Sequence, residues 1–105
     1  MSDSTPSQTP LTILAITVAE TGRENELRAA QLRLVEATLK EEGCLRYELN
    51  QSLDDGRILA FVESWTSEET WQAHMNGAAM AAFKASGADK LIRELTLHRL
   101  APLAG

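Results

Sequence analysis

Two ionisable side chains in an otherwise apolar stretch of this sequence have the chemistry needed for proton transfer. Glu63 interrupts the run from Phe61 to Trp65, and His74 follows shortly afterwards. A buried carboxylate is costly without a partner, and an imidazole can hydrogen-bond to or deprotonate a phenol or an enol at neutral pH. We predict that Glu63 holds the imidazole by a hydrogen bond while His74 faces a substrate. The alternative is structural: Glu63 pairs with an arginine or caps the backbone, and His74 orients a neighbour.

Aromatic side chains near this pair can form a pocket. Phe61 and Trp65 share a face of their strand with Glu63 because side chains alternate, and Tyr47 lies on the neighbouring strand. The ring and hydroxyl of Tyr47 suit a pocket, although a tyrosine at a seam between two subunits would look the same. Trp71 is expected to be a packing residue or partly exposed.

The elements that must position these residues follow from the spacing of apolar side chains. Leu11 to Ala19 is rich in aliphatic and β-branched residues on both faces, which predicts a strand buried on both sides. Thr21 and Glu24 have the spacing of a capping box, so a helix is expected to follow and to stop near Gly43. Its apolar stripe has helical spacing and consists of Leu27, Ala30, Leu34, Thr38, Val35 and Leu39.

The second half of the chain predicts a hairpin, two helices and a last strand. Cys44 to Ser52 alternates with a period of two, Leu53 to Gly56 is typical of a tight turn, and Ile58 to Trp65 is the returning strand. Thr66 and Glu69 form a second capping-box pattern that opens a helix carrying His74 and Met75. Ala78 to Ala85 predicts a short third helix, and Leu91 to Leu100 alternates as the fourth strand.

This order of elements predicts an α+β, ferredoxin-like βαββαβ domain. Its four-stranded antiparallel sheet carries both helical segments on one face. The other face of the sheet would be apolar and uncovered, so a second copy of the chain is expected to cover it as a homodimer. The domain is expected to span residues 11–101, after a polar and flexible leader at residues 1–10.

Three motifs on these elements resemble the antibiotic biosynthesis monooxygenase family. They are Glu42 to Leu49, then Phe61 to Trp65, then Ala73 to Met75. The resemblance implies a dimeric α/β barrel in which each subunit has a pocket between its sheet and its helices. It also implies that Trp65 is a wall for stacking a planar substrate, and that Phe83 and Met80 close the pocket.

The resemblance implies an oxidoreductase without a cofactor: a monooxygenase that acts with dioxygen on a small electron-rich aromatic, such as a quinol or a polyketide. Two alternatives remain: an isomerase of a small phosphorylated dicarbonyl, with Arg46 or Arg57 as the cation, and a non-catalytic dimeric module that binds a ligand. Haem degradation ranks lower, because related haem-degrading proteins carry an asparagine on the first strand and Leu11 to Ala19 has none.

The bulk properties exclude several other classes of protein. A net charge of −5 with scattered basic residues argues against nucleic-acid binding. The longest apolar stretch is about half of what spans a bilayer, so no membrane segment or signal peptide is expected. Cys44 is the single cysteine and the histidines are far apart, which predicts no metal site, an inert thiol and a cytoplasmic location.

Overall fold

The computed structural model describes residues 9–105, so most of the predicted leader, at residues 1–8, lies outside the described residues. The elements in chain order are β1 (Leu11–Ala19), α1 (Glu24–Thr38), β2 (Cys44–Gln51), β3 (Ile58–Trp65), α2 (Glu68–Met75), α3 (Ala78–Ala85), η2 (Ala88–Leu91) and β4 (Ile92–Leu100). Within residues 9–105, no helix is long and apolar enough to cross a membrane.

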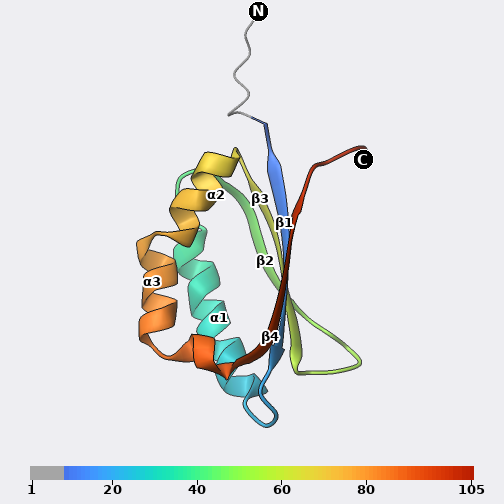
Figure 1. The fold of residues 1–105 in the computed structure, drawn as a ribbon, viewed down its shortest axis with the longest axis vertical. Helices are drawn as coiled ribbons and strands as arrows, with labels where there is room; N and C mark the ends of the chain where they lie inside the picture. Colours follow the sequence, from blue (N-terminus) through green and yellow to red (C-terminus); the bar gives the residue numbers. More distant parts are fainter. Residues whose placement is uncertain (1–8) are drawn as a thin grey trace, which may run out of the picture.

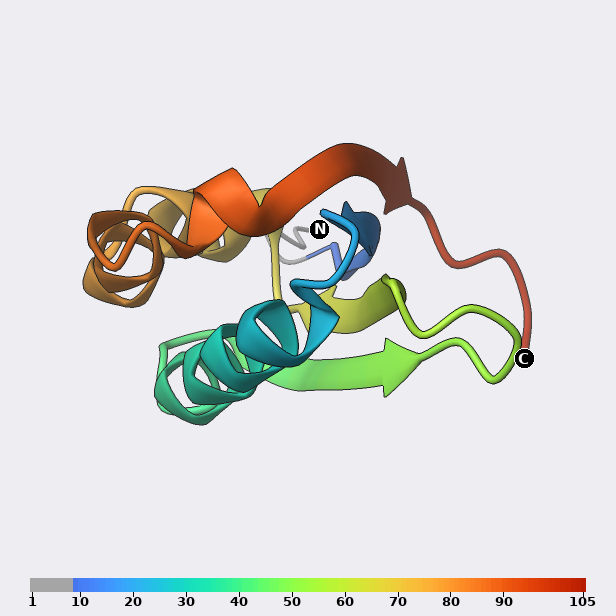
Figure 2. The same cartoon turned by 90° about the horizontal axis from the view of Figure 1, so that it is seen from below.

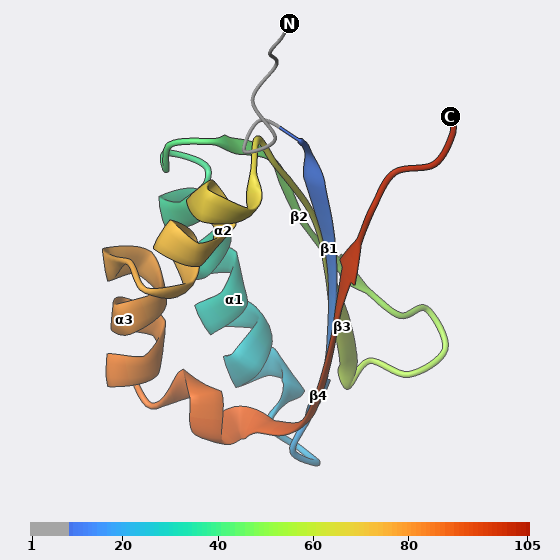
Figure 3. The ribbon, with the colours of Figure 1, turned by 45° about the horizontal axis from the view of Figure 1, so that its top comes forward.

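The four strands form one antiparallel sheet in the order β2-β3-β1-β4, which confirms the ferredoxin-like fold. All helices lie against one face of this sheet, and the other face is bare (Figures 1 and 3). Seen from below, α1 lies on the side of β2, whereas α3 and η2 lie on the side of β4 (Figure 2). The helices and the sheet therefore form two layers.

The core lies between these layers because alternate side chains of the central strands point at the helices. Ile13 on β1 and Trp65 on β3 are fully buried there, and they belong to one cluster with Leu34 of α1. The opposite face of β1 and β3 carries half-buried aliphatic side chains, among them Ile16 and Val62. Both central strands are therefore apolar on both faces, as the sequence predicted.

Helix α1 follows the predicted stripe but not the predicted ends. Leu27, Ala30, Leu34 and Thr38 are buried and Val35 is half-buried, which confirms most of the stripe. Leu39 is the exception: it is the C-cap residue and is 55% exposed. The capping box at Thr21 is wrong, because Arg23 is the N-cap residue and makes no side-chain cap. The helix ends at Thr38, before Gly43, which instead begins the approach to β2.

Helix α2 is capped one residue later than the sequence predicted. Ser67 is the N-cap residue, and its hydroxyl accepts a hydrogen bond from the backbone N–H of Thr70 at 3.2 Å. The Thr70 hydroxyl accepts in return from the Ser67 backbone, so the box uses Thr70 in place of the predicted Glu69. This reciprocal cap fixes the start of the helix that carries His74.

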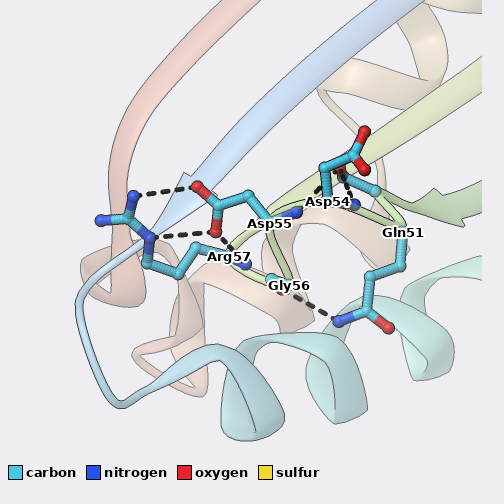
Figure 4. Close-up of polar contacts among 6 residues, drawn as sticks. Gln51, Asp54, Asp55, Gly56 and Arg57 are labelled. Carbon is cyan, nitrogen blue, oxygen red and sulfur yellow. Dashed lines mark hydrogen bonds and ion pairs between the residues drawn. The ribbon is translucent and has the colours of Figure 1, made fainter.

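The connection between β2 and β3 runs from Ser52 to Arg57 and is longer than the tight turn predicted over Leu53 to Gly56. Ser52 Oγ accepts from the N–H groups of Asp54 and Asp55, while Asp55 holds the Arg57 guanidinium at 2.9 Å (Figure 4). These local bonds satisfy polar groups that a looser loop would leave to water. They fix the register that brings Tyr47 opposite Glu63.

Strand β4 is only partly covered. It begins at Ile92, because the residues before it form the 3₁₀ turn η2 and not the predicted start of the strand at Leu91. Leu95 and Leu97 lie opposite Thr17 and Ala15 and so face the helical layer, yet they are 60% and 37% exposed. The helical layer is therefore open along β4.

Candidate functional site

A cavity of about 240 Å³ lies between the sheet and the helices. Six of the seven residues predicted to form the site line it: Tyr47, Phe61, Glu63, His74, Met80 and Phe83. Leu95 and Leu97 of β4 also line it, and their exposure marks the open side. The site thus collects residues from both layers of the fold, with a mouth at β4.

His74 is held as a proton acceptor by a carboxylate that the sequence did not reveal. The imidazole is 2% exposed, and its Nδ1 lies 2.7 Å from Glu41 Oε1. A carboxylate oxygen accepts, so Nδ1 donates and carries the proton. In the neutral imidazole, Nε2 is then left with its lone pair, 3.5 Å from the Tyr47 hydroxyl. The tautomer is therefore the one that can accept a proton at Nε2.

The predicted hydrogen bond between Glu63 and His74 is wrong. Glu63 Oε1 instead accepts from the indole N–H of Trp65 at 2.9 Å. The Trp65 ring stacks on the imidazole, with ring centroids 4.8 Å apart and an interplanar angle of 29°. Glu63 is therefore bonded to the tryptophan that stacks on His74, and not to His74 itself. Glu63 and His74 nevertheless line the same cavity.

Trp65 is the one predicted site residue that does not line the cavity. Its side chain is fully buried, because the imidazole of His74 covers one face of the ring. A substrate in the cavity therefore does not stack on Trp65 as the sequence predicted. The Trp65 ring instead packs against His74 and fixes the plane of the imidazole.

Trp71 and Gln31 line the cavity instead, and sequence reasoning gave neither a role at the site. Trp71 Nε1 and Gln31 Oε1 are buried without a hydrogen-bond partner in the described part of the chain. Buried polar groups are nearly always paired in folded proteins, so an unpaired donor and an unpaired acceptor beside a cavity point to a ligand. A polar residue inside an apolar helix stripe was the available signal for Gln31.

Glu63 is an unusual carboxyl group because it is 4% exposed. Burial raises its pKa to about 7, although the hydrogen bond from Trp65 favours the ionised form. Burial and the nearby Glu63 also raise the pKa of the Tyr47 hydroxyl far above its usual range. Tyr47 therefore stays protonated, whereas Glu63 can gain or lose a proton near neutral pH.

The raised pKa of Glu63 predicts that stability falls as pH rises. Between pH 4.5 and about 7 the folded state binds the proton that the unfolded state has released, so unfolding becomes easier with increasing pH. We expect Glu63→Gln, which keeps the shape, to have a free energy of unfolding about 3 kcal/mol higher than that of the wild type at pH 8, and to lose this advantage at pH 4. Urea unfolding at both values measures it.

Glu48→Gln is the matched control, because Glu48 is exposed and faces the other side of the sheet beside Val62. Its pKa is lowered by Arg46, so its contribution has the opposite sign and is small. Equal pH dependence in the wild type and in Glu63→Gln would contradict the assignment to Glu63.

Glu41 reaches His74 because a glycine brings its loop against α2. Gly43 has φ of +81°, and a Cβ atom there would lie 2.4 Å from Thr70 Cβ. The Gly43 carbonyl also accepts from the backbone N–H of Thr66 at 2.9 Å. The loop and the first turn of α2 are therefore in direct contact, which keeps the Glu41 carboxylate within hydrogen-bond distance of His74.

Other predicted ligand sites are not formed at this cavity. Arg46 pairs with Glu48 and Arg57 pairs with Asp55, and neither arginine lines the cavity, so the cations expected for an isomerase of a phosphorylated substrate lie elsewhere. Residues 9–105 hold no group of three or more side chains suited to a metal ion. Burial raises the pKa of the free Cys44 thiol, which disfavours the reactive thiolate.

The sequence of this chain matches a known family over most of its length. Residues 11–86 match the family model described as antibiotic biosynthesis monooxygenase, which is more than half of the 105 residues. The chain belongs to this family. No protein of curated function matches the sequence.

Several solved structures share the fold of this chain and between a quarter and a third of its sequence. PA3566 from Pseudomonas aeruginosa is 28% identical with a TM-score of 0.85, and the match covers 93% of this chain and 98% of that one. SO0527 from Shewanella oneidensis is 27% identical with a TM-score of 0.81, covering 89% and 90%. Rv0793 from Mycobacterium tuberculosis is 26% identical with a TM-score of 0.82, covering 91% and 97%.

Proposed function

We propose that this member of the antibiotic biosynthesis monooxygenase family is a cofactor-independent monooxygenase that oxidises a small quinol-like aromatic with dioxygen. The observation that carries the proposal is the state of His74. Glu41 accepts the Nδ1 proton, Trp65 fixes the ring plane, and Nε2 keeps its lone pair in a mostly apolar cavity, with only the long 3.5 Å contact to the Tyr47 hydroxyl for a substrate to displace. A base in a dry aromatic pocket is what such chemistry requires.

The first step is proton transfer from the substrate. A phenolic hydroxyl gives its proton to His74 Nε2, and the resulting imidazolium is stabilised by Glu41 at 2.7 Å. The indole N–H of Trp71, which has no partner in the described chain, is suited to donate to the phenolate oxygen. The phenolate is electron-rich enough to transfer one electron to dioxygen.

The remaining steps account for both oxygen atoms. The aryloxyl radical and superoxide combine, which forms a C–O bond at a ring carbon that bears hydrogen. The imidazolium of His74 protonates the terminal peroxide oxygen. Transfer of the ring proton to the departing oxygen then accompanies cleavage of the O–O bond, so one oxygen stays as a carbonyl of a quinone and the other leaves as water. Glu63, with a pKa of about 7, can supply or take a proton in these later steps.

The size of the cavity favours a small substrate. A cavity of about 150 Å³ holds a benzene ring, and this cavity measures about 240 Å³. It therefore suits one or two fused rings better than a tricyclic polyketide.

Oxygen uptake tests the proposal directly. An oxygen electrode should record consumption with mono- and bicyclic quinols in the absence of flavin, haem and added metal, and slower consumption with tricyclic anthrones. Tight binding of quinols without oxygen uptake would overturn the catalytic proposal and favour a non-catalytic binding module.

We also propose that two copies of the chain pair through the bare face of the sheet. This face carries half-buried aliphatic side chains along β1 and β3, and polar residues of β2 and β4 form its rim. A contiguous apolar surface with a polar rim is typical of a subunit interface. One free thiol, Cys44, fits the reducing cytoplasm as the location of this dimer.

Sedimentation at micromolar concentration is expected to report twice the chain mass of 11.5 kDa. Ile16→Asp, in the middle of the bare face, should give a monomer because it buries a charge at the interface. Leu53→Asp is the control, since Leu53 lies in the exposed hairpin loop, and it should remain dimeric. A wild type that stays monomeric contradicts the interface.

A further inference from the structure

The cavity has a second polar position that the proposed proton transfer does not use. Gln31 of α1 lines the cavity and is 1% exposed. Its amide nitrogen donates to Thr17 Oγ1 at 3.1 Å, and the Thr17 hydroxyl donates to the Leu59 carbonyl at 3.1 Å. Because the proton of Thr17 is committed to Leu59, Thr17 can only accept from Gln31. The amide orientation is therefore fixed by its partners, and Gln31 Oε1 is left as a buried acceptor without one.

This acceptor is a candidate for recognising a donor on a ligand. A buried carbonyl oxygen that has no hydrogen bond destabilises the folded state, so a ligand that donates to it relieves this cost. In the wall of an apolar cavity, a small number of placed polar groups fix the orientation of what binds there. A hydroxyl group is the simplest ligand group that can donate to Gln31 Oε1 and remain neutral.

The register of the sheet separates this acceptor from the base. Thr17, which orients Gln31, lies opposite Leu59, whereas Tyr47, beside His74, lies opposite Glu63. At the rise of an extended strand, Leu59 and Glu63 are on the order of 13 Å apart along β3. Gln31 and His74 therefore lie toward opposite ends of the cavity, and a ligand that bonds to both carries its two oxygens on opposite sides of a ring.

We propose that Gln31 determines substrate specificity by accepting a hydrogen bond from a second hydroxyl, para to the one that His74 deprotonates. The substrate class is then a ring with two para-related hydroxyl groups. The identity of the reacting end depends on the proposed function. The preference for the second hydroxyl is a property of binding, and it is measurable without turnover.

The experiment compares three ligands under anaerobic conditions: hydroquinone, phenol and 4-methoxyphenol, which has an acceptor where hydroquinone has a donor. Dissociation constants come from calorimetry with the full chain. The wild type is expected to bind hydroquinone about ten-fold more tightly than either analogue, which corresponds to one neutral hydrogen bond. Gln31→Leu removes the acceptor at similar volume and should reduce this ratio to about one, and Gln31→Met serves if the leucine variant does not fold.

Met80→Leu is the matched control, because Met80 lines the same cavity without a polar group. It is expected to shift all three dissociation constants alike and keep the ratio. A ratio near one in the wild type, an unchanged ratio in Gln31→Leu, or no binding of any of the three overturns the role of Gln31. If the ratio depends on Gln31 but no oxygen is consumed, the role of Gln31 stands and the monooxygenase proposal is overturned. If oxygen is consumed but the ratio does not depend on Gln31, the monooxygenase proposal stands and the role of Gln31 is overturned.

Discussion

His74→Ala is expected to lower kcat/KM for a quinol by about 10³-fold, within the range that general acid-base catalysis contributes. Glu41→Gln should lower it by about 10²-fold, although Glu41 does not line the cavity. The glutamine amide can donate to Nδ1, which would move the imidazole proton to Nε2 and remove the acceptor that the substrate needs. Oxygen uptake at saturating dioxygen measures both losses.

The two residues act as one unit if Glu41 works through His74. The double variant should then be little worse than His74→Ala alone, since groups that act together are strongly non-additive. Glu42→Gln is the matched control, because Glu42 is the exposed neighbour of Glu41, and its rate should be unchanged. Multiplied losses in the double variant, or a full rate in Glu41→Gln, would show that this pair is structural.

A spectroscopic measurement separates positioning from simple loss of structure. The chain has two histidines, so ¹⁵N spectra of the imidazoles contain the signals of His74 and His98 only. His74 should show a protonated Nδ1 and an unprotonated Nε2 in the wild type, with the distribution altered in Glu41→Gln. His98 lies exposed on β4 and should not change between the two proteins.

Gly43→Ala is expected to be the most destabilising small substitution outside the core. Its φ of +81° is strained for alanine, and the added Cβ would lie 2.4 Å from Thr70 Cβ, where no flexible atom can give way. Backbone strain of about 1 kcal/mol and an overpacking cost of about 2–3 kcal/mol together lower the free energy of unfolding. For a domain of this size, this loss lowers Tm by more than about 15 °C. Thermal unfolding measures it.

Gly22→Ala is the matched control, because Gly22 has the same φ of +81° with no atom near the added Cβ. It carries the backbone strain alone, so its Tm should fall by only about 5 °C. Equal shifts in the two variants would show that the contact with Thr70 is not tight. A larger shift in Gly43→Ala supports the contact that holds the Glu41 loop against α2.

Much of the fold could be predicted from the sequence because it depends on local patterns. The two-residue alternation from Ile58 to Trp65 and the helical stripe through Leu27 and Leu34 each fix which face of an element is buried. The errors lie at element ends, where Thr21 and Glu69 have capping types but Arg23 and Thr70 take the positions. Caps depend on where the chain turns, which short sequence patterns define only within a few residues.

The sequence by itself predicted that Glu63 and His74 would lie near each other between the sheet and the helices, because of strand alternation and the return of a helix over the sheet; both line the same cavity. Only the tertiary structure decided which groups bond. Glu41 reaches His74 across 33 residues of chain, while Trp65 lies between His74 and Glu63. A hydrogen bond forms within about 3 Å, and the rotation of a helix over a sheet moves a side chain by more than that. The partner of His74, and the unpaired groups of Gln31 and Trp71, are therefore set by how the two layers meet.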